Sequence, residues 1–498
     1  MGDAVTMLCI ALFIHCAILF FNVVFKSCCL YPYFKFLKKS GIEISFLTIK
    51  CSTTIFNRPL QKWGIWRPRF LKLWFTAGTY VSLLLLPISL TLLIRSLILT
   101  ISQRGTSEPT TDAASLELVI PGYNLPLSDL GYYSISMLLC TVVHEIGHAV
   151  AAVREDVHIY GTGFLLVFIF PAACVNLDSD RLGSLPPMRR LRILCAGVWH
   201  NLLLAVYAAI IVFSLPILTQ PFYTTGEGVY VMSISPDSPA TGPSGLLEGD
   251  VVTSINQCSV ARKSAWKKCI ADAHRYPTPG YCISAEFVRE NDESAPDHPT
   301  VEGAVACCPP QACKEGRLCF QLVDDSGGPV ALPEYSCLLA RKLVKENIGY
   351  CANQSPNYCS SQLHCLRPSV VNNTKLLAIN RVKGEVVLFL GNPTEIYSTV
   401  QVVDYVPKWN IYDPYIPQFL ENLLKYVCMM SSGLAVVNVL PAFFFDGQYI
   451  ASTLCDLFLG SRVKDNSKRL AISLCTSFCG TVLLLTALIT PIVLQYIY

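Results

Sequence analysis

Residues 130–153 read LGYYSISMLLCTVVHEIGHAVAAV, an apolar run that is long enough to cross a bilayer as one helix. Three ionisable residues, His144, Glu145 and His148, interrupt its second half. Ionisable side chains inside a membrane helix are costly and by default indicate function. The stretch therefore predicts a transmembrane helix that carries a polar site within the bilayer.

The rest of the chain has the composition of a membrane protein. Its 498 residues are 52% hydrophobic and only 15% charged, with a mean hydropathy of +0.45, whereas soluble chains carry about 25% charged residues. A net charge of +3 without a polybasic tract argues against a nucleic-acid partner and leaves the lipid bilayer as the expected surroundings. We expect a polytopic α-helical protein with about six transmembrane helices, the other five being 4–25 (a retained anchor), 73–94, 193–218, 423–445 and 470–497.

The distribution of basic residues predicts the topology. The loop 26–72 holds ten Lys and Arg against one acid, and the short connection 178–192 holds four Arg. The positive-inside rule places both in the cytosol, so segment 219–417 is expected in the lumen. The apolar run 159–175, broken by glycines and a proline, is predicted to form a buried hairpin or re-entrant segment. If this run spans the bilayer instead, the predicted orientation of the later helices is reversed.

Cysteines support a luminal location for segment 219–417. Eleven of the 23 cysteines fall between Cys258 and Cys365, and a glycosylation sequon begins at Asn372. This pattern predicts a disulfide-bonded loop with Asn372 as a glycan acceptor. A zinc ribbon is the alternative, but two spaced Cys-x-x-Cys pairs are missing. Because eleven is odd, at least one thiol is free or pairs outside this stretch.

The flanks of the cysteine-rich stretch look like two halves of one PDZ domain. Alternating apolar residues after Gly226 and again in 375–406 predict strands, with the insertion at about 258–365 between them. An unrelated small β domain is the alternative. The predicted domains are then 1–100 (N-terminal helices and basic loop), 128–218 (catalytic membrane core), 219–417 (luminal PDZ-like α+β domain with its insertion) and 418–498 (C-terminal helices).

The sequence His144-Glu145-Ile-Gly-His148 predicts a metal site. On a helix, residues i and i+4 share a face, so both imidazoles can bind one Zn²⁺, while Glu145 can take a proton from a metal-activated water. The alternative, two histidines satisfied in a polar bundle core, would leave Glu145 in need of a buried partner.

A catalytic zinc site needs a third protein ligand at membrane depth. Asp446 follows the apolar run of the fifth predicted helix, and Pro441 is expected to kink that helix toward the site. Composition alone favours the alternative, in which Asp446 is a helix-end residue in the headgroup region.

Three motifs together resemble the site-2 protease family of intramembrane metalloproteases. They are the His-Glu-x-x-His sequence, Asn438-x-x-Pro441-x-x-x-x-Asp446-Gly447, and Gly197-x-x-x-Asn201. The resemblance implies one Zn²⁺ per chain bound by His144, His148 and Asp446, with Glu145 as the catalytic base. It also implies that Asn201 and Asn438 polarise a carbonyl or position the substrate, although helix-to-helix hydrogen bonds could explain either amide.

The same resemblance implies a function. We expect a metalloendopeptidase of the Golgi apparatus and endoplasmic reticulum, with its active site toward the cytosolic leaflet, that makes the second cut in regulated intramembrane proteolysis. Its substrates would be single-pass or hairpin membrane proteins already cut by a luminal protease, such as the membrane-anchored transcription factors of sterol and unfolded-protein signalling. An inactive peptide-binding scaffold and a metal transporter are the competing classes. The intact Glu145 argues against the scaffold, and the lack of repeated ionisable residues along a path argues against the transporter.

Overall fold

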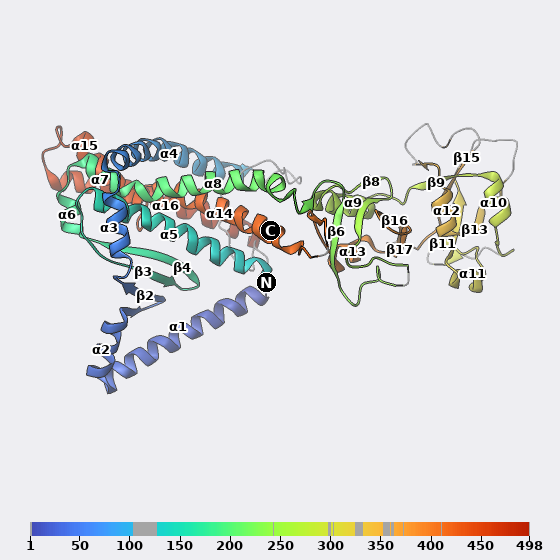
Figure 1. Cartoon of the computed structure of the whole chain (residues 1–498), viewed down its shortest axis with the longest axis horizontal. Helices are drawn as coiled ribbons and strands as arrows, with labels where there is room; N and C mark the ends of the chain where they lie inside the picture. The colour runs from blue at the N-terminus through green and yellow to red at the C-terminus, as the bar shows by residue number, and fades with distance from the viewer. Residues whose placement is uncertain are drawn as a thin grey trace. The chain divides into compact units, whose positions relative to one another are not determined.

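The computed structural model describes residues 2–102, 127–242, 244–296, 300–301, 303–323, 332–351, 359, 363–371, 373–409 and 411–497. The chain divides into two compact units, Met1–Phe213 with Glu421–Tyr498, and Ser214–Leu420. Among the described residues, six helices are long and apolar enough to cross a membrane, which confirms a polytopic protein with about six such helices (Figure 1). They are Leu8–Cys28, Pro68–Ser102, Leu130–Arg154, Pro187–Thr219, Tyr415–Val439 and Asn466–Pro491.

The first unit is mainly helical. Its helices are α1 (Gly2–Cys28), α2 (Leu30–Ser40), α3 (Asn57–Ile65), α4 (Pro68–Ser102), α5 (Leu130–Arg154), α6 (Ser179–Ser184), α7 (Pro187–Leu194), α15 (Asp446–Leu459) and α16 (Asn466–Ile497), with most of α8 (Ala196–Thr219) and α14 (Tyr415–Val439). A single 3₁₀ turn, η2 (Leu127–Asp129), precedes α5. Long apolar segments without internal breaks favour helices because every backbone group is then bonded within its own segment.

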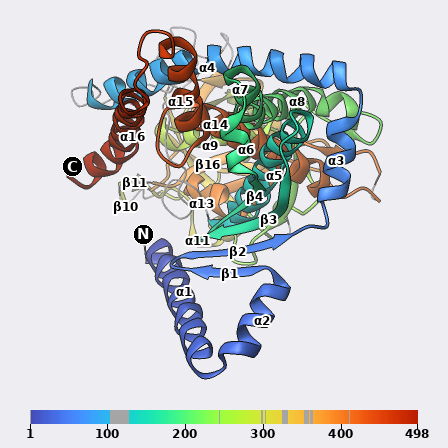
Figure 2. The same ribbon diagram turned by 90° about the vertical axis from the view of Figure 1, so that its left-hand side faces the viewer.

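The segment 159–175 forms a β-hairpin, β3 (Ile159–Val167) and β4 (Phe170–Leu177). It pairs with a second hairpin from the basic N-terminal loop, β1 (Ile42–Ser45) and β2 (Thr48–Thr53), in an antiparallel sheet of order β1-β2-β3-β4. β4 runs along α5, as Figure 2 shows. β2 and β3 come from distant parts of the chain and pair with each other. β4 pairs with the other side of β3 and is therefore an edge strand of the sheet, the one nearest the ionisable residues of α5.

The fifth membrane helix differs from the prediction. The apolar run 423–445 was expected to continue as one helix, kinked at Pro441, up to Asp446, whereas α14 ends at Val439 and Asp446 begins the separate helix α15. Proline lacks an N–H and disfavours helical backbone in the residue before it, which ends the helix. The connecting turn includes Phe444 in the left-handed region (φ 73°). The Phe443 N–H in this turn donates to Thr481 Oγ1 of α16 at 2.9 Å, and this hydrogen bond joins the turn to α16.

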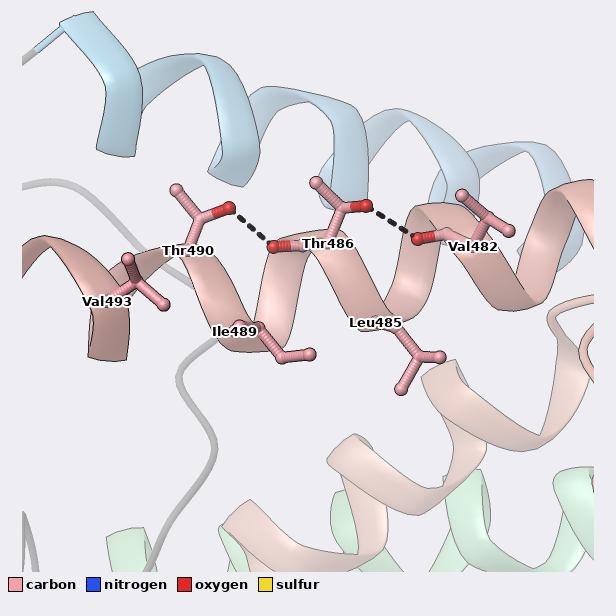
Figure 3. Close-up of a pocket in the computed structure, with 6 residues that line it drawn as sticks. All are labelled: Val482, Leu485, Thr486, Ile489, Thr490 and Val493. Carbon is pink, nitrogen blue, oxygen red and sulfur yellow. Dashed lines mark hydrogen bonds between the residues drawn. The ribbon is translucent and has the colours of Figure 1, made fainter.

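One face of α16 carries mainly apolar side chains. Six of its residues line a shallow cavity of about 400 Å³: Val482, Leu485, Thr486, Ile489, Thr490 and Val493 (Figure 3). The hydroxyls of Thr486 and Thr490 both donate to carbonyls one turn earlier in the same helix, at 2.7 and 2.6 Å. These six residues therefore behave as an apolar surface and do not offer a ligand or a base.

The second unit contains two larger sheets. One has the order β17-β16-β7-β6-β18, with β8 paired to β7. Its strands come from both flanks of the cysteine-rich stretch, so the two segments expected to form one domain share a sheet. The elements are β6 (Val229–Ile234), β7 (Val251–Ile255), β8 (Cys258–Ser259), β16 (Lys375–Arg381), β17 (Val387–Gly391) and β18 (Val400–Val403), with α9 (Lys263–Arg275) and α13 (Pro393–Thr399).

The cysteine-rich stretch forms the second sheet, of order β13-β12-β15-β9-β14. Its elements are β9 (Gly280–Ser284), β12 (Arg317–Leu322), β13 (Tyr335–Leu339), β14 (Tyr350–Cys351) and β15 (Leu363–Pro368), with α10 (Ala285–Asn291), α11 (Pro310–Lys314) and α12 (Ala340–Glu346). The described residues of the unit also include two small two-stranded sheets: β10 (Thr300–Val301) with β11 (Ala304–Val305), and β5 (Tyr223–Thr224) with β19 (Val406–Pro407).

Ten of the eleven cysteines in this stretch form disulfides with one another, and the eleventh, Cys313, is a free and exposed thiol. The pairs are Cys258–Cys269, Cys282–Cys359, Cys307–Cys319, Cys308–Cys337 and Cys351–Cys365. These bonds account for the close approach of Cys282, Cys351 and Cys359, which would otherwise look like a metal cluster. The glycosylation prediction at Asn372 lies outside the described residues.

Candidate metal centre

Two helices bring three donor atoms together in the first unit. His144 and His148 come from α5, and Asp446 is the first residue of α15. Asp446 Oδ2 lies 3.0 Å from His144 Nε2 and 3.1 Å from His148 Nε2, and the two Nε2 atoms are 3.0 Å apart. The three residues predicted as ligands are therefore adjacent in space, although 298 residues separate His148 from Asp446.

The three distances match a single small cation. A tetrahedral ion with bonds of 2.0–2.1 Å requires its ligand atoms to lie about 3.3 Å apart. The observed triangle, with edges of 3.0 to 3.1 Å, is close to that size. Two imidazoles and a carboxylate are also a donor set that zinc accepts, and they leave the fourth tetrahedral position open. The residues present thus fit a catalytic zinc ion.

Glu145 lies beside the cluster and is held by the edge of the sheet. Its Oε2 accepts the Val175 N–H of β4 at 3.0 Å, and one turn earlier Thr141 Oγ1 accepts the Ala173 N–H at 3.1 Å. Both N–H groups belong to β4, the edge strand of the sheet. The sheet therefore supplies a fixed donor that orients the Glu145 carboxylate.

The turn before α15 sets the position of Asp446. A Cβ on Gly447 would lie 1.8 Å from the Leu440 carbonyl oxygen, so only glycine allows α15 to start this close to the end of α14. A Cβ on Gly480 of α16 would meet the Pro441 carbonyl oxygen at 2.1 Å. These two close backbone approaches hold the start of α15, and with it the carboxylate, against α5.

The segment α7–α8 contacts both histidines of the cluster. His148 Nδ1 donates to the Ile193 carbonyl oxygen at 2.8 Å, and the amide of Asn201 lies 3.2 Å from His144 Nδ1. Between them, a Cβ on Gly197 would lie only 2.4 Å from His148 Nε2 and 2.6 Å from His144 Nε2. The backbone of α8 therefore touches the donor atoms, and a carbonyl group fixes the His148 ring as metal-binding histidines require.

The residues of the cluster are largely shielded from solvent. His144 and His148 are each 7% exposed, and the Asp446 side chain, at 21%, marks the open side of the site. On the flank of α5 beyond Glu145 lies an apolar cavity of about 230 Å³ between α3 and the sheet, lined among others by Trp63, Ile146 and Phe164. Glu145 is the one charged group among the described residues that line this cavity, so its carboxylate faces a low-dielectric space.

The other predicted residues occupy different places. Asn201 is fully buried against His144, whereas Asn438 of α14 is half-buried and its side-chain amide makes no hydrogen bond with any described residue. His200 lies outside the cluster, with Nδ1 bonded to the Ala196 carbonyl oxygen. The sequence reasoning missed the contributions of Ile193 and Val175, which act through their backbones and leave no side-chain signal. Gly197 had a signal, a glycine one turn from Asn201 on the same helix face.

Comparison with known proteins agrees with this geometry. Residues 132–482 match the model of peptidase family M50. A protein of Arabidopsis thaliana named "Membrane-bound transcription factor site-2 protease homolog" is 27% identical over 471 residues, which cover 84% of this chain and 87% of the relative. The matched residues include His144, Glu145 and His148 of α5 and the start of α15 at Asp446. The chain therefore belongs to peptidase family M50, the site-2 protease family of membrane metallopeptidases.

Proposed function

We propose that the chain is an intramembrane zinc endopeptidase that hydrolyses a peptide bond within the membrane segment of its substrates. The observation that carries this is the triangle of donor atoms from His144, His148 and Asp446, with edges of 3.0 to 3.1 Å, beside Glu145 on an apolar helix. A purely structural cluster has no need of an adjacent carboxylate that is not a ligand. Membership of a metallopeptidase family supports the same role.

Each residue then has a defined task. His144, His148 and Asp446 hold the zinc ion, which when bound acidifies a water molecule and polarises the scissile carbonyl. Glu145 accepts the proton of the attacking water and delivers it to the departing amine nitrogen, so that atoms and charge balance over the hydrolysis. The Val175 N–H keeps the carboxylate oriented, and the apolar surroundings exclude bulk water from the proton transfer.

The position of the site within the membrane is inferred from the basic connection beside it. Ile193, which bonds His148, directly follows Arg192. Arg189 and Arg192 both pair with Glu155 at the end of α5, at 2.6 and 3.0 Å. His148 thus lies within about two turns, and His144 within about three turns, of an arginine-rich end of α5. The positive-inside rule supports a cytosolic location for that end, so we propose cleavage near the cytosolic leaflet.

We further propose that the substrates are membrane-anchored transcription factors of sterol and unfolded-protein signalling, cut first by a luminal protease. The name of the Arabidopsis relative refers to a membrane-bound transcription factor protease, which supports this class. Five disulfides in the second unit fit the oxidising lumen of the endoplasmic reticulum and Golgi apparatus.

We assign the second unit a PDZ-like role in choosing substrates. Its sheet is assembled from both flanks of the disulfide-bonded stretch, as a PDZ-like domain with an insertion requires. PDZ domains capture extended peptides along a strand edge and can bind a free C-terminus. A luminal first cut creates such an end, so this unit would select substrates that have already been shortened.

The decisive experiment measures zinc content and cleavage of a transmembrane peptide by purified protein, with Glu145→Gln as the test variant. We expect about one zinc per chain in both proteins and cleavage only in the wild type. A protein that contains zinc but does not cleave, or a Glu145→Gln variant that retains more than a few per cent of activity, would contradict the proposed role.

A further inference from the structure

Asn201 contacts His144 at Nδ1, whereas the ring nitrogen that faces the other two donor residues is Nε2. It is 0% exposed, and its amide lies 3.2 Å from Nδ1 of His144. Its Oδ1 is buried and has no hydrogen-bond partner among the described residues when Nδ2 faces the ring. A buried acceptor without a partner costs about 1 to 3 kcal/mol, so this orientation of the amide is unfavourable.

The protons of the imidazole ring resolve the conflict. A neutral His144 that binds a metal through Nε2 carries its proton on Nδ1, which must then donate. An NH₂ group facing Nδ1–H would bring two donors together. Rotation of the amide by 180° exchanges its two ends and points Oδ1 at the ring, which gives both the buried oxygen and the ring N–H a partner.

We propose that Asn201 is a positioning residue whose Oδ1 accepts the Nδ1–H of His144 and so directs Nε2 toward the metal. This inference rests on the proposed zinc function. It assigns Asn201 a task different from polarising the substrate carbonyl, for which the amide would have to face the open side of the site. A fully buried side chain behind His144 cannot do so without moving the ring.

The neighbouring residues of the same segment support this assignment. Ile193, Gly197 and Asn201 follow one another at intervals of four residues, and such residues share one face of a helix. Ile193 provides the acceptor for His148 Nδ1, and Gly197 allows the backbone to reach both rings. With Asn201 Oδ1 as the acceptor for His144 Nδ1–H, the Nδ1–H of each imidazole donates to one acceptor in the segment α7–α8.

The test compares Asn201→Leu, which removes the acceptor at similar volume, with Asn201→Asp, which keeps an acceptor and removes the NH₂ group. The full-length chain is purified in detergent, and its zinc dissociation constant is measured by competition with a chelator. Thr79→Val is the matched control, because Thr79 is a buried hydroxyl on α4 that bonds only to its own helix at Phe75. Cleavage of a transmembrane peptide is recorded in parallel.

We expect Asn201→Leu to weaken zinc binding by about 10- to 100-fold, the usual effect of losing a partner of a metal-binding histidine. Asn201→Asp should bind zinc at least as tightly as the wild type and should still cleave. Thr79→Val should match the wild type in both measurements.

The opposite pattern would overturn the proposal. If Asn201 polarised the substrate carbonyl, both variants would bind zinc normally, and Asn201→Asp would lose cleavage because a carboxylate repels the developing negative charge. If Asn201→Leu fails to fold, the cleavage by Asn201→Asp still decides between the two roles. A wild-type protein that binds no zinc would instead contradict the proposed function itself, a separate result.

Discussion

Gly197→Ala tests whether the backbone of α8 limits the geometry of the cluster. The added methyl group would lie 2.4 Å from His148 Nε2, 2.5 Å from His144 Cε1 and 2.6 Å from His144 Nε2. These distances are about 1 Å shorter than an ordinary carbon contact of about 3.5 Å. The His148 ring cannot easily move away, because its Nδ1 is bonded to the Ile193 carbonyl oxygen. Relief of the clash must therefore displace the donor atoms.

The expected size of the effect comes from the cost of overpacking, about 1 to 3 kcal/mol. If that cost falls on the metal-bound geometry, zinc binding weakens by about 5- to 150-fold, since 1.4 kcal/mol is a factor of ten. Alanine favours a helix interior over glycine by about 1 kcal/mol. This gain offsets overpacking that remains in the metal-free protein, so its melting temperature should change little. A loss of metal affinity without a loss of stability is the diagnostic result.

The assay is chelator competition on full-length protein in detergent, together with thermal unfolding of the metal-free form. Gly131→Ala is the matched control, because Gly131 also lies in a membrane helix, α5, and a Cβ there would meet nothing within 4 Å. Its zinc affinity should equal that of the wild type. A Gly197→Ala variant with unchanged zinc affinity would refute the idea that α8 touches the donor atoms.

Four further outcomes are expected. Glu145→Gln should abolish cleavage and leave zinc bound, and residual turnover above a few per cent would assign the base elsewhere. Asp446→Ala should lose both metal and activity because three protein ligands are needed, whereas full zinc occupancy would contradict Asp446 as a ligand. Replacing Gly226 to Val406 by a short linker should relax the preference for pre-cut substrates without removing zinc, and an unchanged preference would argue against a selecting role. Because a helical substrate hides its carbonyls in hydrogen bonds, Gly, Pro or Asn near its middle should speed cleavage a few residues from its cytosolic border; mass spectrometry that finds the cut at the luminal end would refute this.

The residues of the site could largely be predicted from the sequence, whereas the path of the chain between them could not. His144 and His148 lie one turn apart on one helix, so their convergence follows from local periodicity. Asp446 was predicted as the third donor, but on a continuous helix that the structure breaks at Val439. An apolar run looks the same whether it is one helix or a helix followed by a turn, and the anchoring of that turn to α16 is a long-range contact.

The hairpin 159–175 was likewise predictable from the sequence only in part. Its glycines and proline indicated an irregular apolar segment, but they carried no information about its partner. The pairing of β3 with β2 joins residues more than 100 positions apart, and it places Val175 where its N–H reaches Glu145. Disulfide partners are equally non-local. The odd number of cysteines required one that is free or pairs outside the stretch, and only the fold shows that Cys313 is this residue and that its thiol is free.

The sequence alone determined the membrane-spanning character of this protein and the candidate donor pair His144 and His148, because hydrophobic length and helical periodicity act over a few neighbouring residues. Asp446 was predicted as the third donor only through the family resemblance. Tertiary structure decided which backbone groups complete the site. The Ile193 carbonyl, the Val175 N–H and the space that Gly197 leaves open contribute through position alone. Every residue type has a backbone, so these roles exist only once distant segments have packed together.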